Sequence, residues 1–463
     1  MPFSAYLEGK REDVRALVKA LRRSFEYVSA LGTDVRSSIC RVDRNTMSIK
    51  DGDGECGFVF KMQRGGSYYE YSTDDLSGDR DELIKRILKN ASEVPGFRVI
   101  EPGAVPDPEE RADFGRETDF DEYTDEYLLR LCKDLSNDLL SRDEKVSNAI
   151  ARLSTLSVSK LFISENRELS QHYGWANGIL AAIYRDGKTV QARQMEGDAT
   201  LRGVIEKLKN DVGPVLELAR RLATAEPIEP GVYDVITDPS ITGLIAHEAF
   251  GHGVEMDQFV KDRAQAKNFI GQYVASPVVN MHDGAAATLS VASYFFDDDG
   301  VPAHDTEIIR NGILVAGLSD LTSATELGSD PTGNGRRDSF KRKAYARMTN
   351  TFFCPGKDKI EDMIASIKHG YMLFQTNNGM EDPKNWQIQC TAEYGIEIVD
   401  GKLTDRYVSP VVMSGYVPDL LKSITMVSDE FRIDGSGFCG KGYKEWVRVS
   451  DGGPHLKARV KLG

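Results

Sequence analysis

Two histidines and a glutamate interrupt an apolar, glycine-spaced segment near the middle of the chain, Ile241 to Gly253. Its polar core reads His247-Glu248-x-x-x-His252, one residue longer than the His-Glu-x-x-His signature of zinc proteases. In a regular helix, residues five positions apart point about 140° apart, so the two imidazoles would diverge. A single-turn π-bulge accommodates the extra residue, and we expect Gly251 to absorb the distortion because it has no Cβ. The segment is therefore predicted to aim His247 and His252 at one ion.

This arrangement predicts a hydrolytic metal centre. Glu248 follows the first histidine and is placed to take a proton from a water on the metal. Zinc suits such a site, because it lowers the pKa of a bound water to about 7. The alternative is a buried helix with two hydrogen-bonded histidines, and the short motif alone does not separate the two. Two of only seven histidines fall within this hexapeptide, which favours the metal site.

A catalytic zinc site usually has three protein ligands and one open position, so a third ligand is required. The candidates are Glu255, Asp257, His282, His304, Cys390 and Cys439. Cys439 stands out because it lies in a glycine-rich turn, 435–441, where Lys441 would favour the thiolate. Residue chemistry alone does not choose among the candidates.

Composition limits the partners and the compartment. The formal net charge of −14 opposes a general nucleic-acid or anionic-membrane surface, because phosphate binding needs clustered Lys and Arg. The chain has no run of about 18 apolar residues, and its first residues form no apolar core of signal-peptide length. The six cysteines are scattered without a Cys-x-x-Cys pair, which indicates reduced thiols. We expect a cytoplasmic protein that binds neither nucleic acid nor membrane.

The 463 residues are enough for two or three domains, and the pattern of elements predicts an α+β fold. Residues 1–95 and 121–226 share a helix–strands–helix order, which suggests a diverged duplication within an N-terminal domain, 1–226. An acidic, proline-rich surface linker, 101–120, joins the two units. Prolines and a glycine near residue 227 mark the start of a strand-rich C-terminal domain, 227–463, which is barrel- or sandwich-like and carries the metal-binding helix.

Local periodicity predicts individual elements. Helical stripes are expected over 11–29, 123–153, 201–208 and 215–222, with Gly213-Pro214 breaking the last pair. A β-branched stretch at 288–296 is expected to be a strand, and Asn311-Gly312 and Asp400-Gly401 are expected to be hairpin turns. Asp238 is expected to cap the metal-binding helix.

The chain resembles the TldD/PmbA family, specifically its metal-bearing TldD type. The resemblance spans the chain and is most specific over residues 230–441. It rests on the order of several motifs: His247-Glu248-Ala249-Phe250-Gly251-His252-Gly253, Asp298 to Pro302, Asn311 to Leu314, Pro331 to Arg337, Arg347 to Thr351, and Cys439-Gly440-Lys441.

The resemblance implies a zinc metallopeptidase acting on unfolded or small peptides. It places the metal on His247, His252 and Cys439 and makes Glu248 the catalytic base. It also implies a dimer, either of two like subunits or with a PmbA-type partner that lacks the metal motif. The older family label, modulator of DNA gyrase, is not supported as direct DNA binding by this charge balance. Two other functions stay open: a non-catalytic peptide-binding or maturation subunit with a structural metal, and a metal-dependent amide or ester hydrolase.

Four further residues are candidates for substrate binding: Asn334, Arg336, Arg337 and Asn350. The two arginines follow a glycine-containing turn and could grip a peptide carboxylate, or they could be ion-paired within the turn. Residues 377–382, 442–446 and 454–463 depart from the family pattern, which leaves substrate preference and partner choice open.

Overall fold

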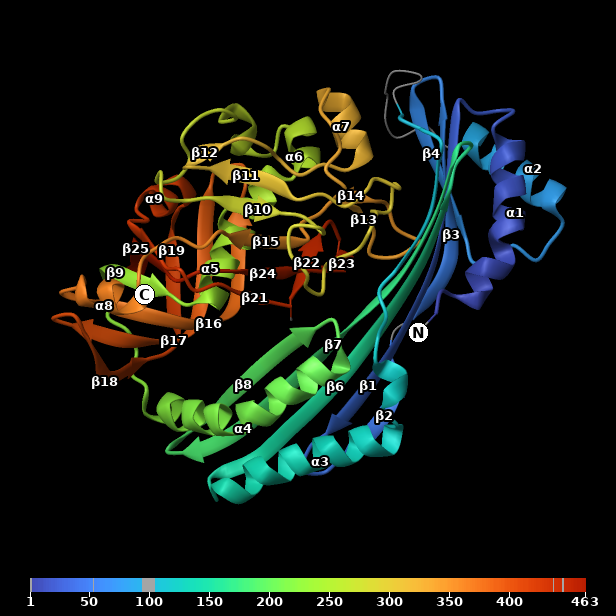
Figure 1. The fold of residues 1–463 in the computed structure, drawn as a ribbon. Coiled ribbons are helices and arrows are strands. Elements are labelled where there is room, and N and C mark those ends of the chain that lie inside the picture. Colours follow the sequence, from blue (N-terminus) through green and yellow to red (C-terminus); the bar gives the residue numbers. More distant parts are fainter. Residues whose placement is uncertain (1, 53, 94–104, 436, 444) are drawn as a thin grey trace.

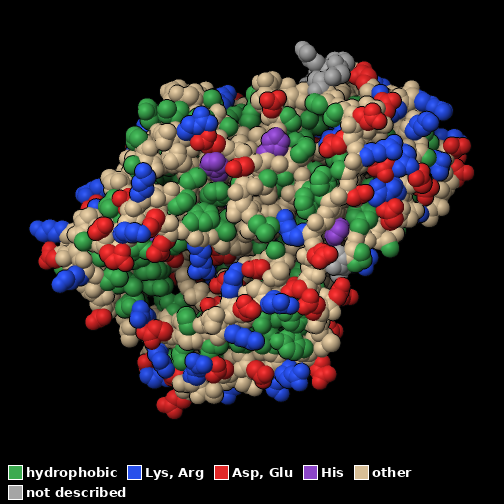
Figure 2. All heavy atoms as spheres, viewed as in Figure 1, with side chains coloured by type: hydrophobic (Ala, Val, Ile, Leu, Met, Phe, Trp, Pro, Cys, Tyr) green, Lys and Arg blue, Asp and Glu red, His purple; other side chains and the backbone are tan. Residues whose placement is uncertain are grey.

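The structure, a computed structural model, describes residues 2–52, 54–93, 105–435, 437–443 and 445–463. Residues 101–104 of the predicted linker lie outside the described residues. A long, twisted sheet formed by the first 200 residues runs beside a compact C-terminal region, and α1 and α2 cover the outer side of one end of that sheet (Figure 1). Acidic and basic side chains are interspersed over the face seen in Figure 2.

The N-terminal helices are α1 (Ala5–Leu21), α2 (Arg80–Glu93), α3 (Asp125–Arg142) and α4 (Leu201–Thr224), with the 3-10 turn η1 (Phe120–Glu122). The strands are β1 (Tyr27–Val42), β2 (Met47–Asp51), β3 (Glu55–Arg64), β4 (Ser67–Thr73), β5 (Glu110–Gly115), β6 (Val146–Ile163), β7 (Arg167–Asp186) and β8 (Lys188–Asp198). They form one eight-stranded sheet in the order β4-β3-β1-β6-β7-β5, with β2 beside β1 and β8 beside β7.

The central pair of this sheet is β1 and β6, which run antiparallel. Each belongs to one unit with the order helix, strands, helix, and each unit has its own apolar core beneath its helices. This arrangement agrees with the expected order of elements, and the duplication itself stays a prediction. The predicted linker also contributes strand β5, because its backbone pairs in parallel with the edge of β7.

Several expected element boundaries are wrong. The helix expected over 11–29 ends at Leu21. Phe25 then reaches the same core from the turn that follows, and Val28 reaches it from strand β1. The helix expected to run to residue 153 ends at Arg142, where β6 soon begins. Helix α4 continues through Pro214, since burial of apolar residues on both sides outweighs the lost hydrogen bond.

The C-terminal helical segments are α5 (Pro239–Leu244), the π-helix η2 (Ile245–Gly251), the 3-10 turns η3 (His252–Val254) and η4 (Gln265–Asn268), α6 (Met256–Val260), α7 (Leu321–Leu327), α8 (Ile360–Ala365) and α9 (Val417–Lys422). The strands are β9 (Gly231–Thr237), β10 (Met281–Asp283), β11 (Thr306–Arg310), β12 (Ile313–Leu314), β13 (Gly335–Arg336), β14 (Tyr345–Ala346), β15 (Asn350–Phe353), β16 (His369–Asp382), β17 (Gln387–Val399), β18 (Lys402–Val408), β19 (Val411–Tyr416), β20 (Met426–Val427), β21 (Arg432–Asp434), β22 (Phe438–Lys441), β23 (Glu445–Arg448), β24 (Ser450–Gly453) and β25 (Leu456–Leu462).

Five of these strands close on themselves. The order β16-β9-β25-β19-β17 is completed by pairing of β17 with β16, so the C-terminal region contains a small barrel. A second sheet, β12-β11-β10-β15-β24-β21, lies against the α5–η2 segment (Figure 1). The expected strand-rich, barrel-like region is confirmed. The strand expected at 288–296 is absent; that segment is a loop whose carbonyl at Thr288 accepts a hydrogen bond from Asn350.

Buried ion pairs join the N-terminal sheet to the C-terminal region. Lys61 on β3 donates to Asp299 at 2.7 Å, and both side chains are buried. Lys160 on β6 pairs with Asp298 beside it. The aspartates of the Asp298-Asp299-Gly300 motif therefore hold the two regions together.

Replacing Lys61 by Met should lower the free energy of unfolding by about 3–5 kcal/mol, because it leaves the buried carboxylate of Asp299 without its cation. Chemical denaturation monitored by tryptophan fluorescence measures the change. Lys85→Met is the matched control, since Lys85 and its partner Glu82 are both exposed, and it should barely move the transition. Equal transitions for the two variants would contradict the prediction.

Candidate metal centre

The histidine segment begins with a capped helix. The Asp238 carboxylate accepts a hydrogen bond from the Ile241 amide at 2.8 Å, and Pro239 occupies the first helical turn, where its missing N–H costs nothing. Helix α5 then passes into the π-helix η2, Ile245–Gly251. The predicted widening of the turn and the predicted cap are both present.

Gly251 has a different role from the one expected. Its φ of −60° is ordinary for a helix, so the backbone does not require glycine there. A Cβ at this position would lie 2.1 Å from the Sδ of Met348, so glycine is required by close packing. Gly243 similarly permits contact with the backbone of Gly452, which brings β24 and its Asp451 against the helix.

The widened turn brings together three groups that could hold a metal ion. Ligand atoms of His247, His252 and Cys439 all lie within 4.8 Å of one another. The two imidazole centroids are 5.1 Å apart, with nearly perpendicular planes. The Sγ of Cys439 is 3.6 Å from the Nε2 of His252. Tetrahedral coordination with Zn–N near 2.0–2.1 Å and Zn–S near 2.3 Å separates such a pair by about 3.6 Å, so the residues fit a zinc ion.

A buried network holds His252 in place. Its Nδ1 lies 3.2 Å from an oxygen of Glu255, which leaves Nε2 facing Cys439. Lys441 donates to Glu255 at 3.0 Å and to Asp257 at 2.6 Å. Carboxylates in this position orient metal-binding histidines and raise their basicity. Glu255 and Asp257 were candidates for the third ligand. Both instead accept hydrogen bonds from Lys441, and neither belongs to the cluster of His247, His252 and Cys439.

Electrostatics favour a thiolate at Cys439. Burial alone would raise the pKa of Cys439, but the charges of His252 and His247 outweigh it and hold that pKa well below its usual range. For His247 burial alone would lower the pKa, but the neighbouring Cys439 outweighs burial and raises that pKa to about 9. The positive charge that lowers the pKa of Cys439 comes mainly from the two histidines, while the ammonium of Lys441 is paired with Glu255 and Asp257.

The motif at 347–351 positions Cys439 through a hydrogen bond to its backbone carbonyl. The buried guanidinium of Arg347 donates to the Cys439 carbonyl at 2.7 Å, while Met348 packs against Gly251. The same motif is anchored by Asp283, which accepts hydrogen bonds from the hydroxyls of Thr349 and Thr351. One short segment thus fixes both the cysteine hairpin and the histidine helix.

Glu248 lies at the same cluster. One of its oxygens is 4.0 Å from the Nε2 of His252, and burial raises its pKa. Its side chain packs where a Cβ on Gly379 would otherwise lie, so Gly379 makes room for it. These residues border a pocket of about 720 Å³, which is walled by the β16–β17 hairpin on one side and the β22–β23 hairpin on the other. Residues 377–381 of the divergent segment 377–382 belong to this wall.

The four predicted substrate-binding residues lie elsewhere. Asn334 and Asn350 are fully buried and donate to protein oxygens, among them Asp283 for Asn334 and the Gly284 carbonyl for Asn350. Arg337 forms a buried ion pair with Glu70 at 2.7 Å. Arg336 donates to the carbonyls of Met348 and Arg448. Both arginines border a second cavity, and a role in substrate binding stays a prediction.

Sequence patterns did not indicate the carboxylates that surround the cluster of His247, His252 and Cys439. Asp451 lies 3.9 Å from His247, and Glu381 accepts a hydrogen bond from the Gly253 amide at 3.0 Å. Burial raises the pKa of Asp451 to about 7 and that of Glu381 well above its usual range. Neither residue stands near the histidines in the sequence, and only strand pairing brings them there.

A π-helical His-Glu-x-x-x-His segment joined to a distant cysteine, beside an open pocket, defines a metallohydrolase type of site. Comparison with known proteins agrees with this class. Residues 230–461 match the family model described as PmbA/TldA metallopeptidase C-terminal domain. A protein of Methanothermobacter thermautotrophicus named metalloprotease is 30% identical over 434 residues, covering 92% of this chain and 93% of its own. The chain belongs to the TldD/PmbA family of metallopeptidases.

Two further likenesses are informative. The zinc metalloprotease TldD homolog of Saccharolobus solfataricus is 30% identical over 310 residues, covering 65% of this chain and 68% of its own. A Thermotoga maritima protein, described with its crystal structure as a candidate modulator of a DNA gyrase, superposes with a TM-score of 0.78 over 99% of this chain and 100% of its own. Its identity is 18%, so it shows the fold. Within the described ranges, no helix combines the length and apolarity needed to cross a bilayer.

Proposed function

We propose that the chain is a zinc-dependent peptidase that hydrolyses small or unfolded peptides. The observation that carries this proposal is the meeting of His247, His252 and Cys439 within 4.8 Å, with the Glu248 carboxylate 4.0 Å from one of them. The three ligands leave a fourth position of a tetrahedral ion for solvent or substrate, as catalytic zinc sites require. Zinc held there lowers the pKa of a coordinated water to about 7 and polarises a carbonyl.

The chain's own groups supply the remaining chemistry. Glu248 accepts the proton of the attacking water and returns it to the leaving amine, a role that its raised pKa suits. Glu255 keeps the His252 ring oriented, and Lys441 keeps Glu255 ionised by lowering its pKa against the effect of burial.

The pocket supports a peptide substrate. Its walls are two β-hairpins, which present backbone and side chains to an extended segment, and its volume accommodates several residues. A compact folded domain would not reach the buried ligands. Assembly as a dimer, with a like subunit or a PmbA-type partner, belongs to the same proposal, as does a cytoplasmic location.

Removing the metal tests the proposal directly. Dialysis against a chelator should lower cleavage of an unstructured, fluorogenic peptide by at least about 100-fold, since the ion polarises the reacting carbonyl. One equivalent of Zn²⁺ should restore it. His282→Ala is the control, because this histidine contacts Asp305 outside the cluster and should leave zinc content and turnover intact. Full turnover by protein stripped of metal would refute the proposal.

A further inference from the structure

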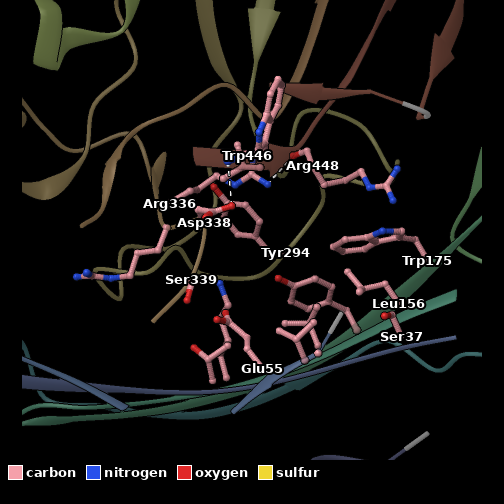
Figure 3. A pocket seen from close by; sticks show the side chains of 18 of the residues that line it. Ser37, Glu55, Leu156, Trp175, Tyr294, Arg336, Asp338, Ser339, Trp446 and Arg448 are labelled. Carbon is pink, nitrogen blue, oxygen red and sulfur yellow. Dashed lines mark hydrogen bonds between the residues drawn. The ribbon is translucent and has the colours of Figure 1, made fainter. Parts of the chain in front are cut away.

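A second cavity, of about 480 Å³, lies between the N-terminal sheet and the β22–β23 hairpin. Alternate residues of β6, from Arg152 to Lys160, line its floor, as expected for one face of a strand. Trp175 on β7 and Tyr294 add aromatic surface, and Arg448 extends from β23 toward the side where Trp175 lies (Figure 3).

The hairpin that carries Cys439 separates this cavity from the metal pocket. Cys439 pairs with Val447, and both are buried on one face of the hairpin. Phe438 and Arg448 form the adjacent pair, so their side chains point to the opposite face. Phe438 and Trp446 border both cavities. At about 3.4 Å per residue along a strand, Arg448 lies within a few residues' length of the metal ligand.

Among the described residues, three cations that line this cavity have no ion pair: Arg152, Arg336 and Arg448. Arg336 is satisfied by the carbonyls of Met348 and Arg448, which leaves Arg152 and Arg448. Lys160 pairs with Asp298, and Arg337 pairs with Glu70. No carboxylate within the described ranges forms an ion pair with Arg152 or Arg448, and the Nε atom of each is buried without a hydrogen bond.

The cavity's own acidic groups are otherwise engaged. Asp338 accepts from the Trp446 amide and Glu55 from the Phe340 amide. The Arg448 guanidinium is stacked 4.1 Å from the centroid of the Phe438 ring, which fixes its plane but provides no negative charge. Burial, and then the nearby charge of Arg152, lower the pKa of Arg448 to about 10. Two like charges in a desolvated cavity are costly unless an anion joins them.

We propose that Arg152 and Arg448 form a carboxylate-binding subsite that holds an acidic group of the peptide while another part of that peptide lies at the metal. Guanidinium groups match a planar carboxylate with two parallel hydrogen bonds, and the aromatic walls accept the carbon chain that bears it. Phe438 and Trp446 lie where a peptide passes from one cavity to the other. The subsite rests on the proposed peptidase function, and it makes peptides with a carboxylate at one end of the bound segment the preferred substrates.

Binding to the inactive variant Glu248→Gln tests the subsite apart from turnover. Two pairs of fluorescein-labelled unstructured peptides are compared by anisotropy: one pair differs only in a C-terminal carboxylate or amide, the other only in one Glu or Gln, with the terminus amidated. We expect the carboxylate member of one pair to bind about tenfold more tightly, as charge-assisted hydrogen bonds give. The pair that discriminates identifies the source of the carboxylate.

Adding Arg152→Gln and Arg448→Gln together should reduce that preference to about one. Arg448→Lys should retain part of the carboxylate preference, because the positive charge stays while the two parallel hydrogen bonds of the guanidinium are lost. Arg220→Gln is the control, because Arg220 is a half-exposed residue of α4 that pairs with Asp143; this variant should leave the carboxylate preference unchanged. The unfolding temperature of the double variant should not fall, since neither arginine has an ion pair to lose. Equal affinities within both pairs, no binding, or a preference that survives the double substitution would each overturn the subsite.

The outcomes separate this inference from the proposed function. A carboxylate preference in binding without cleavage by the wild-type chain would leave the subsite standing and refute the peptidase. Cleavage of peptides with no carboxylate preference in binding would support the peptidase and refute the subsite.

Discussion

Replacing Glu248 by Gln should lower kcat for an unstructured peptide by about 10²–10⁴-fold, the range that general base catalysis contributes. The amide has nearly the same size as the carboxylate and cannot accept the proton. Because Glu248 lies beside the cluster while the three predicted ligands are other residues, the variant should keep its zinc. Steady-state kinetics on the purified variant, with metal content measured on the same sample, checks both statements.

Glu381→Gln is the matched control for this experiment. Glu381 borders the same pocket and accepts a hydrogen bond from the Gly253 amide, which the amide oxygen of Gln can accept as well. Its effect on kcat should be far smaller than that of Glu248→Gln. If the two variants lost activity equally, or if Glu248→Gln stayed active, the assignment of Glu248 as the base would be wrong.

The part of the site that depends on spacing along the chain was predictable. Histidines five positions apart can share an ion only if a helical turn widens, and the π-helix at Ile245–Gly251 is that widening. The glycine within it was identified for the wrong reason, because its backbone is regular and the close contact comes from Met348, nearly a hundred residues later. Geometry local to a segment can be deduced from its sequence, whereas close contact with a distant segment cannot.

The choice of the third ligand shows the same limit. Residue chemistry left six candidates, and the family resemblance pointed to Cys439. The structure brings Cys439 to the histidines because β22 pairs with β23 and Arg347 holds the Cys439 carbonyl. The supporting carboxylates at positions 381 and 451 come from separate strands, so no pattern around the histidines could have indicated them.

Element boundaries failed where tertiary burial competed with local signals. Phe25 and Val28 continue the apolar spacing of α1, yet Phe25 reaches the same core from the turn after the helix and Val28 reaches it from strand β1. In the loop at 288–296, buried side chains such as Asn350 and Gln171 satisfy backbone groups that a strand ladder would otherwise satisfy. Val291 and Tyr294 of this loop pack against Val158, Tyr173 and Trp175 of the N-terminal sheet without forming a strand.

Replacing Cys439 by Ala should weaken zinc binding by more than about 100-fold, because losing an orienting partner of a ligand alone costs 10–100-fold and here a ligand itself is lost. The thiolate also supplies the negative charge that raises the pKa of His247, so its removal leaves two buried imidazoles with no anionic ligand. Peptide cleavage should fall with the metal. Competition with a chromophoric chelator measures the affinity.

Cys390→Ala and Glu255→Gln are the controls for this experiment, with no effect and an intermediate effect expected on zinc affinity. Cys390 is buried in the same domain but lies outside the His247, His252 and Cys439 cluster, so its loss should leave zinc affinity unchanged. Glu255 contacts His252 without belonging to the cluster, so its amide should weaken zinc binding by about 10–100-fold. The order Cys439→Ala, then Glu255→Gln, then Cys390→Ala follows because Cys439 is a predicted ligand, Glu255 contacts one, and Cys390 lies outside the cluster. If Cys439→Ala kept full affinity, the cysteine would not be a ligand, and the two histidines would have to bind the metal with one of the pocket's carboxylates, such as Glu248.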